Sequence, residues 1–242
     1  ANNNTAIGRS ALSANTTGTG NTTVGHNAGK KTTTASNNTA VGKDSLEENT
    51  TGAGNTAIGK DALQANTTAS DNTAVGVQAL QSNTEGTRNT AVGAAALDAN
   101  TTANDNTGIG HLALTVNTTG AQNTAVGAYA LDANTEGDNN VAVGRAALST
   151  NTTAANNVAV GHSALEINTT GSQNVAIGSY ALDANTTAAN NVAIGYLSLT
   201  RNSTGTNNVG IGRSTLEYNT TANDNTAVGY QALYSNTTAG NN

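Results

Sequence analysis

The sequence contains no Cys, Pro, Phe, Trp or Met, and its only aromatic residues are six Tyr. Without large aromatic side chains, a chain of 242 residues cannot build the core of an ordinary globular domain. The absence of Cys excludes disulfide bonds and thiol nucleophiles. It does not indicate a redox compartment, because a ladder of stacked backbone needs no disulfides.

Charge is scarce as well. Charged residues make up 10% of the chain, and the formal net charge is −6. This charge is too dilute for a disordered polyelectrolyte and has the wrong sign for binding phosphates, so nucleic acid is not an expected partner. No apolar run approaches the about 18–20 residues of a membrane span, and no basic-then-apolar N-terminal segment indicates a signal peptide.

What the sequence does contain is one unit of 17 residues, repeated without an insertion. We number the places of the unit from its leading Asn and call each copy a coil. Coil 1 is then residues 4–20 and coil 14 is residues 225–241, with residues 1–3 as a partial preceding coil and Asn242 as the start of a further one. Both ends are cut within the pattern and lack divergent capping repeats, so we expect a segment of something longer or a unit that stacks on copies of itself. The leading Asn stands at positions 4, 21, 38, 55, 72, 89, 106, 123, 140, 157, 174, 191, 208 and 225.

The first places of each coil have the pattern of a strand. Place 2 is Thr or Val, place 3 is small, place 4 is Val or Ile, and place 5 is always Gly. Leu at place 9 and Asn at place 12 follow in thirteen coils each. Seventeen residues are too few for two helices, and repeated Gly and Thr-Thr disfavour even one. The sequence therefore predicts an all-β parallel β-solenoid, or β-roll, of fourteen coils.

Three sets of columns have predicted structural roles. Asn of place 1 and Gly of place 5 shape the corners, Val or Ile of place 4 and Leu of place 9 fill the core, and Ala of place 3 lets another chain approach closely. In coils 3–6 the corner ladder is Asn38, Gly42, Asn55, Gly59, Asn72, Gly76, Asn89 and Gly93. The core ladder is Val41, Leu46, Ile58, Leu63, Val75 and Leu80, and the chain–chain packing column is Ala40, Ala57, Ala74 and Ala91.

Energetics indicate that such a chain oligomerises. A buried aliphatic side chain contributes about 1.5–3 kcal/mol, whereas ordering the backbone costs about 1–2 kcal/mol per residue. With one Val or Ile, one Leu and a few Ala per coil, the isolated solenoid is marginal, and packing against further copies supplies the missing buried surface.

The sequence offers no clustered catalytic or metal-binding chemistry. The histidines His26, His111 and His162 all stand at place 6 but lie several coils apart, so within one chain they cannot share a metal ion. Carboxylates do not converge as calcium requires. No enzymatic activity, cofactor or metal is therefore expected. The variable places 6, 7, 10, 11, 16 and 17 face solvent, and any recognition must lie there.

Two further patterns involve the Asn-Thr-Thr segment of places 12–14. It satisfies the N-glycosylation motif, as at Asn15, Asn49 and Asn66, although turn chemistry explains these residues without a sugar. The nearly complete Thr columns at places 13 and 14 also suggest ice binding. Neighbouring strand positions point to opposite faces, however, so Thr-Thr does not form two parallel rows of hydroxyls.

At the motif Asn-(Thr/Val)-Ala-(Val/Ile)-Gly the chain resembles the head repeats of YadA-like trimeric autotransporter adhesins. The clearest copy is Asn174-Val175-Ala176-Ile177-Gly178, followed by Ser179, Tyr180 and Ala181. Similar repeats are found in phage tail fibres. The resemblance covers all fourteen coils and implies a left-handed parallel β-roll, with three chains side by side, displayed outside a cell or on a virion. Repeats of that family are commonly about three residues shorter, and we place the extra residues around Asn-Thr-Thr-Gly.

These observations favour a non-catalytic structural module, the head or shaft of an extracellular adhesin or fibre. Its expected partners are two copies of itself and a surface receptor or glycan. A self-assembling extracellular filament of end-to-end stacked solenoids is the alternative, and an ice-binding solenoid is a further one. The chain is expected at a cell surface, in a secreted filament or in a virion fibre.

Overall fold

The computed structural model describes residues 3–242, so Ala1 and Asn2 of the predicted partial coil lie outside the described residues. In this part of the chain the regular structure is entirely β, with one three-residue strand in each coil. The coils form two compact units, unit 1 up to Gln122 and unit 2 from Asn123 to Asn242. Unit 1 contains β1 (Thr5–Ile7), β2 (Thr22–Val24), β3 (Thr39–Val41), β4 (Thr56–Ile58), β5 (Thr73–Val75), β6 (Thr90–Val92) and β7 (Thr107–Ile109). Unit 2 contains β8 (Thr124–Val126), β9 (Val141–Val143), β10 (Val158–Val160), β11 (Val175–Ile177), β12 (Val192–Ile194), β13 (Val209–Ile211) and β14 (Thr226–Val228).

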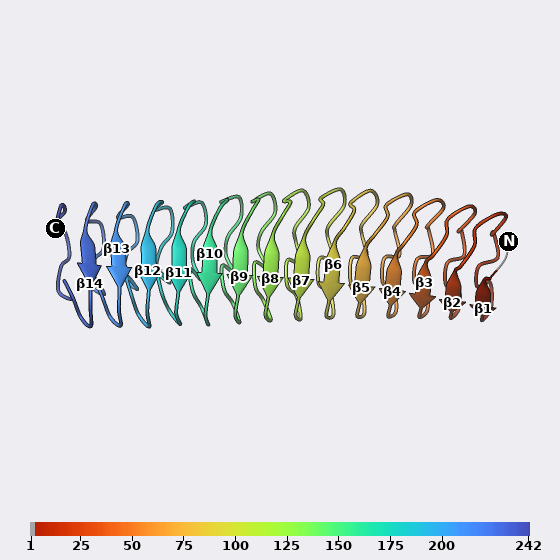
Figure 1. Ribbon diagram of the computed structural model, residues 1–242, viewed down its shortest axis with the longest axis horizontal. Coiled ribbons are helices and arrows are strands. Elements are labelled where there is room, and N and C mark those ends of the chain that lie inside the picture. The colour runs from red at the N-terminus through yellow and green to blue at the C-terminus, as the bar shows by residue number, and fades with distance from the viewer. Residues whose placement is uncertain (1–2) are drawn as a thin grey trace. The chain divides into compact units, whose positions relative to one another are not determined.

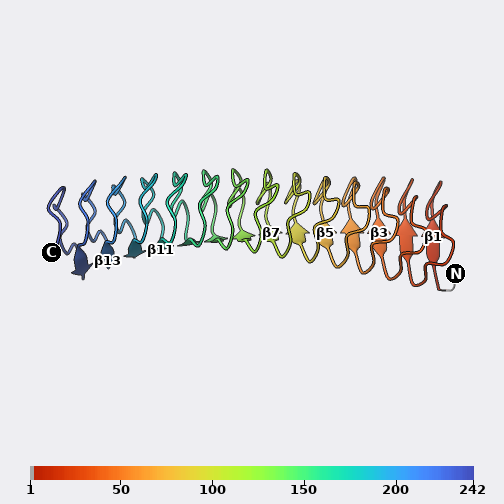
Figure 2. The ribbon, with the colours of Figure 1, turned by 90° about the horizontal axis from the view of Figure 1, so that it is seen from above.

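Within each unit, every strand pairs in parallel with the next and in exact repeat register. Ala40 of β3 pairs with Ala57 of β4 in unit 1, and Ala159 of β10 pairs with Ala176 of β11 in unit 2. Figure 1 shows these strands stacked along each unit, and Figure 2 shows the loops that close every coil. The predicted parallel β-solenoid is thus confirmed.

The segment that carries Leu is a stack of turns and not a second strand. Its backbone still bonds from coil to coil, as in Leu63 N to Ala79 O at 3.0 Å and Ala65 N to Gln81 O at 2.9 Å. The Leu of place 9 has a positive φ, for example 51° at Leu80. Such a φ is uncommon for a residue other than Gly, and it turns the Leu side chain into the coil.

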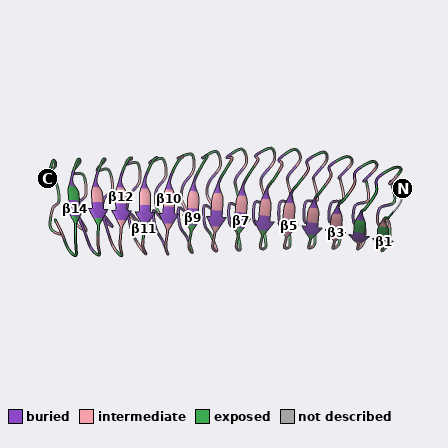
Figure 3. Ribbon diagram, viewed as in Figure 1, coloured by how far each residue is buried: buried purple, intermediate pink, exposed green. Residues whose placement is uncertain are grey.

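The core consists of the Leu column of place 9 packed against the Ala column of place 3. Leu46, Leu63 and Leu80 are at most 1% exposed, as the sequence predicts. Figure 3 shows the alternation of buried and more exposed positions along the strands. A Cβ built on Gly108, which replaces Ala at place 3, lies 3.3 Å from Leu97 Cγ. The close second surface that the small residues indicate is therefore the Leu turn of the solenoid itself.

The prediction that Val or Ile of place 4 fills the core is wrong. Ile58 is 40% exposed, and Val41 and Val75 are only partly buried. The interior between the strand and the Leu turn holds a methyl group opposite each Leu and has no room for a branched side chain. Because side chains alternate along a strand, placing Ala inside turns places 2 and 4 outward.

The chain–chain role predicted for the Ala column is also wrong. These alanines are 0% exposed within a single chain, so no second chain can reach them: Ala40, Ala57, Ala74 and Ala91. Their small size instead fits the narrow interior of their own coil.

Coil 2 shows how this interior tolerates a change. It has Gly29 at place 9 where the other coils have Leu, and Thr23 at place 3 where most have Ala. A Cβ on Gly29 lies 2.9 Å from Thr23 Cγ2, so the larger Thr occupies space that the missing Leu leaves. Gly29 keeps the positive φ of the Leu column, at 58°.

Candidate functional site

No pocket is found in the part of the chain that the structure describes. Among residues 3–242, no group of three or more His, Cys, Asp or Glu side chains is placed to hold a metal ion. The same residues include no helix long and apolar enough to cross a membrane. Candidate functional surfaces must therefore be found among the exposed columns, which the buried ladders position.

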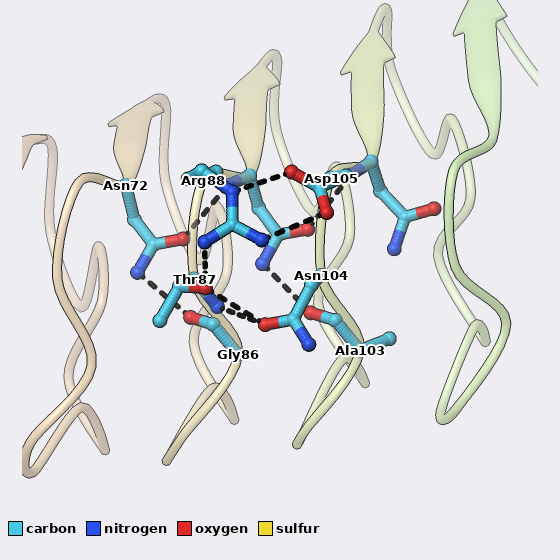
Figure 4. Close-up of polar contacts among 9 residues, drawn as sticks. Asn72, Gly86, Thr87, Arg88, Ala103, Asn104 and Asp105 are labelled. Carbon is cyan, nitrogen blue, oxygen red and sulfur yellow. Dashed lines mark hydrogen bonds and ion pairs between the residues drawn. The ribbon is translucent and has the colours of Figure 1, made fainter.

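The Asn of place 1 links each coil to the next through its side chain. Asn72 Oδ1 accepts a hydrogen bond from Asn89 N at 2.9 Å, and Asn72 Nδ2 donates to Gly86 O at 2.8 Å (Figure 4). Asn72 is 0% exposed, and its own N–H donates to Asn55 Oδ1 at 3.0 Å. The same two bonds recur along the column, as at Asn38. At the predicted corner, this Asn thus forms a ladder of side-chain hydrogen bonds with buried backbone N–H and C=O groups.

The Asn of place 12 forms a second buried ladder. Asn66 Nδ2 donates to Asn49 Oδ1 at 2.9 Å and to Ala69 O at 3.0 Å. Asn49 and Asn66 are 0% exposed and are not among the residues with positive φ, so their corner role comes from side-chain hydrogen bonds. A glycan on this amide nitrogen is incompatible with the folded coil, because the nitrogen is buried and already donates twice.

The Gly of place 5 is required by the next coil. Gly76 has a φ of 142°, and a Cβ at this position would lie 2.4 Å from Gly93 O. Gly42 and Gly59 meet the following coil in the same way, at 2.4 and 2.3 Å. Both the positive φ and the close backbone approach exclude a side chain, as the sequence predicts.

The two Thr columns of places 13 and 14 differ in their roles. The hydroxyl of Thr50 at place 13 donates to Thr67 O of the next coil at 3.0 Å. Thr51 and Thr68 at place 14 are exposed. The place-13 hydroxyls of most coils thus bond the next coil and are partly buried, whereas the place-14 side chains are exposed.

The outward face of the strands, which we call the sheet face, consists of places 2 and 4. It contains only Thr, Val and Ile, and it carries no charge over the described coils. Ile58 of β4 and Ile177 of β11 are 40% and 39% exposed. In unit 1 place 2 is Thr in every coil, whereas in β9–β13 both places are Val or Ile. Each unit thus exposes a regular apolar face, and such faces are typical of interaction sites.

The variable columns of unit 1 carry ion pairs between neighbouring places or coils. Arg88 Nε and Nη2 bind the carboxylate of Asp105 in the next coil at 2.7 and 2.9 Å (Figure 4). This pairing lowers the pKa of Asp105 through the hydrogen bond from Arg88. Lys60 pairs with Asp61 at 2.9 Å. Exposed pairs of this kind contribute little to stability, because water screens the charges.

The variable columns of unit 2 instead carry all six Tyr of the chain. Places 6 and 7 of coils 10–14 bring five side chains into a row, which we call the aromatic stripe: His162, Tyr180, Tyr196, Arg213 and Tyr230. The sequence predicts that recognition lies in these variable places, but it does not show that the rings touch. The signal for the stripe is a Tyr, His or Arg at place 6 or 7 in every coil from coil 7 to coil 14.

The three histidines lie where the sequence places them, on the exposed column of place 6. His26 Nδ1 is 3.7 Å from Asp44 Oδ1 of the next coil. His162 Nε2 is 3.2 Å from Arg145 Nη1 and its ring packs edge-on against Tyr180. His26 and His162 thus each contact a neighbouring coil.

Comparison with known proteins adds no assignment to this geometry. No protein-family model matches the chain, and no curated protein matches it.

Proposed function

We propose that this chain is a structural, non-catalytic module of an extracellular adhesin or fibre and that it works as a side-by-side homotrimer. The observation that supports this proposal best is the sheet face. It is uncharged, flat and regular in each unit, and it leaves Val and Ile side chains more than a third exposed, as at Ile177. A second copy presents the same columns at the same spacing and is therefore a complementary partner.

The sheet face replaces the Ala column as the proposed contact between chains. Val and Ile on three copies can meet around a common axis and bury the aliphatic surface that a single coil leaves in water. The resemblance to YadA-like head repeats supports the same arrangement and suggests display on a cell surface or virion. A left-handed coil and an extracellular location are part of this proposal.

The oligomeric state of the purified chain tests the proposal. We expect a trimer by sedimentation velocity, and we expect Ile177→Lys to give monomers because it brings like charges together on a desolvated face. Thr187→Lys is the matched control, since Thr187 is exposed at place 14 of the same coil. A wild-type chain that sediments as a folded monomer refutes side-by-side assembly.

Ice binding is a second candidate, favoured by one observation in unit 1. There the sheet face carries an unbroken Thr column at place 2 beside the Val and Ile column of place 4, as at Thr56 and Ile58. Hydroxyl and methyl groups at regular spacing on a flat sheet are suited to ordered water. Assembly and ice binding need the same face, so a trimer without thermal hysteresis supports the structural role and a monomer with it supports ice binding. End-to-end stacking into filaments stays a prediction.

A further inference from the structure

The aromatic stripe is continuous over five coils of unit 2. The His162 and Tyr180 ring centroids lie 5.2 Å apart, and those of Tyr180 and Tyr196 lie 6.4 Å apart. The Arg213 guanidinium carbon then lies 5.8 Å from the Tyr196 ring and 5.9 Å from the Tyr230 ring. Unit 1 contains no Tyr and therefore has no comparable row of aromatic rings.

The rings of the stripe are available to a ligand. Tyr196 is 46% exposed and Tyr230 is 66% exposed. They stand at the same place two coils apart, which corresponds to about 10 Å along the solenoid. An extended β-1,4-linked polysaccharide turns each sugar over relative to its neighbour, and one disaccharide has about this length. Alternate sugars of such a polysaccharide therefore present the same face at about the spacing of the Tyr196 and Tyr230 rings.

The charges around the stripe distinguish among possible ligands. Unit 2 has three Arg and seven Asp or Glu, so its net charge is −4 (3 − 7). Carboxylates stand at place 10 of three coils that also contribute to the stripe, as Glu166, Asp183 and Glu217. Side chains of places 7 and 10 are neighbours, because Gln78 Nε2 donates to Gln81 Oε1 at 3.1 Å in coil 5, so Asp183 lies beside Tyr180, the stripe residue at place 7. This carboxylate and the negative charge of unit 2 repel phosphate and sulfate groups, whereas a carboxylate accepts hydrogen bonds from hydroxyls.

We propose that the aromatic stripe binds an extended, neutral β-1,4-linked polysaccharide. The C–H faces of alternate sugars pack on the rings of Tyr196 and Tyr230. Arg213 donates hydrogen bonds to sugar oxygens between them, and the Asp183 carboxylate beside Tyr180 accepts from a sugar hydroxyl. This inference rests on the proposed attachment function and names the ligand class and the surface that provide attachment.

Binding of the neutral hexasaccharides cellohexaose and chitohexaose to the full chain tests the proposal by isothermal titration calorimetry. We expect the wild type to bind at least one of them. The double variant Tyr196→Ala/Tyr230→Ala is expected to bind about 5- to 150-fold more weakly, because it removes two aromatic contacts. Tyr196→Phe/Tyr230→Phe keeps both rings and should retain most of the affinity. Tyr218→Ala is the matched control, since Tyr218 stands at place 11 and pairs with Tyr234 of place 10, outside the stripe.

Sedimentation of the same samples measures assembly separately from sugar binding. Each outcome therefore decides the proposal for the stripe independently of the proposal for the trimer. Absence of binding to both hexasaccharides overturns it, as does an affinity that the double Ala variant leaves unchanged while circular dichroism shows intact folding. Binding of heparin or single-stranded DNA in place of the neutral sugars overturns it too. A trimer that binds no sugar refutes the stripe alone, whereas a monomer that binds sugar through Tyr196 and Tyr230 refutes the assembly alone.

Discussion

The corner ladder gives a sharp stability prediction at Asn72. Substitution Asn72→Ala removes the acceptor for Asn89 N–H and the donor for Gly86 C=O, which lie 2.9 and 2.8 Å from the Asn72 side chain. Gly86 C=O keeps a hydrogen bond from Asn83 Nδ2 at 2.9 Å, so only the buried Asn89 N–H is left unpaired. An unpaired buried polar group costs about 1–3 kcal/mol, which is a substantial part of the about 5–15 kcal/mol by which folded proteins are stable.

Two measurements check this value. Urea denaturation of the variant should show the loss in the free energy of unfolding, and native-state hydrogen exchange should show early opening at the Asn89 amide. Asn104→Ala is the matched control, because Asn104 Oδ1 accepts from Thr87 N and Thr87 Oγ1 on a corner that water reaches. We expect the control to cost less than about 1 kcal/mol, since water replaces the lost acceptor. Equal losses in the two variants would refute the ladder as a source of stability.

The conservative substitution Asn72→Asp separates the two hydrogen bonds. A carboxylate at this place still accepts from Asn89 N but has no proton to donate to Gly86 O, and it buries a charge. Its pKa is raised in the folded state, so the destabilisation is present at neutral pH and is relieved as the pH falls through the raised pKa. A variant whose stability deficit does not depend on pH would contradict this assignment.

Three further changes test the core and the surface. Leu80→Ala should cost about 2–5 kcal/mol in urea denaturation because its side chain is fully buried, and a loss below about 1 kcal/mol would contradict the core assignment. Gly29→Leu should destabilise coil 2 through contact with Thr23, and adding Thr23→Ala should recover stability; additive losses would contradict the compensation. Burial raises the pKa of Asp98, so its charged form destabilises the folded state above that pKa. Asp98→Asn should therefore raise the melting temperature at pH 7 and lose this advantage as the pH falls through the raised pKa, and an advantage that persists in acid would count against it.

The sequence predicts the coil but not which side of the strand faces inward. The strict period, the Leu column and the Gly of place 5 are sufficient to predict the solenoid. Each can be recognised in the sequence without knowing which residues it contacts. Strand alternation separates Ala57 from Ile58 but does not say which of them is inside. Hydrophobicity favours Ile58, whereas the narrow space opposite the Leu column admits only Ala57, and the width of that space depends on the turns that carry the leucines.

The turn itself has only one signal in the sequence. Leu at positive φ is uncommon, so thirteen leucines at place 9 do not suggest a left-handed backbone. Gly29 is the single exception in that column and the residue that prefers this conformation. The aromatic stripe could be noticed as a concentration of Tyr in unit 2, yet the contacts between Tyr180, Tyr196 and Arg213 need the coil geometry.

Each Asn ladder contains a hydrogen bond from an Asn to its counterpart seventeen positions away, as in Asn89 N to Asn72 Oδ1 and Asn66 Nδ2 to Asn49 Oδ1, and this makes length a stepwise property of the protein. A gain or loss of one residue within a strand turns that strand's inward side chain outward and breaks the ladder bonds between that coil and its neighbour. A gain or loss of seventeen residues leaves each remaining contact as it was. Recombination between coils can therefore lengthen or shorten such a protein in whole steps, and it can exchange the coils that carry the stripe without disturbing the rest.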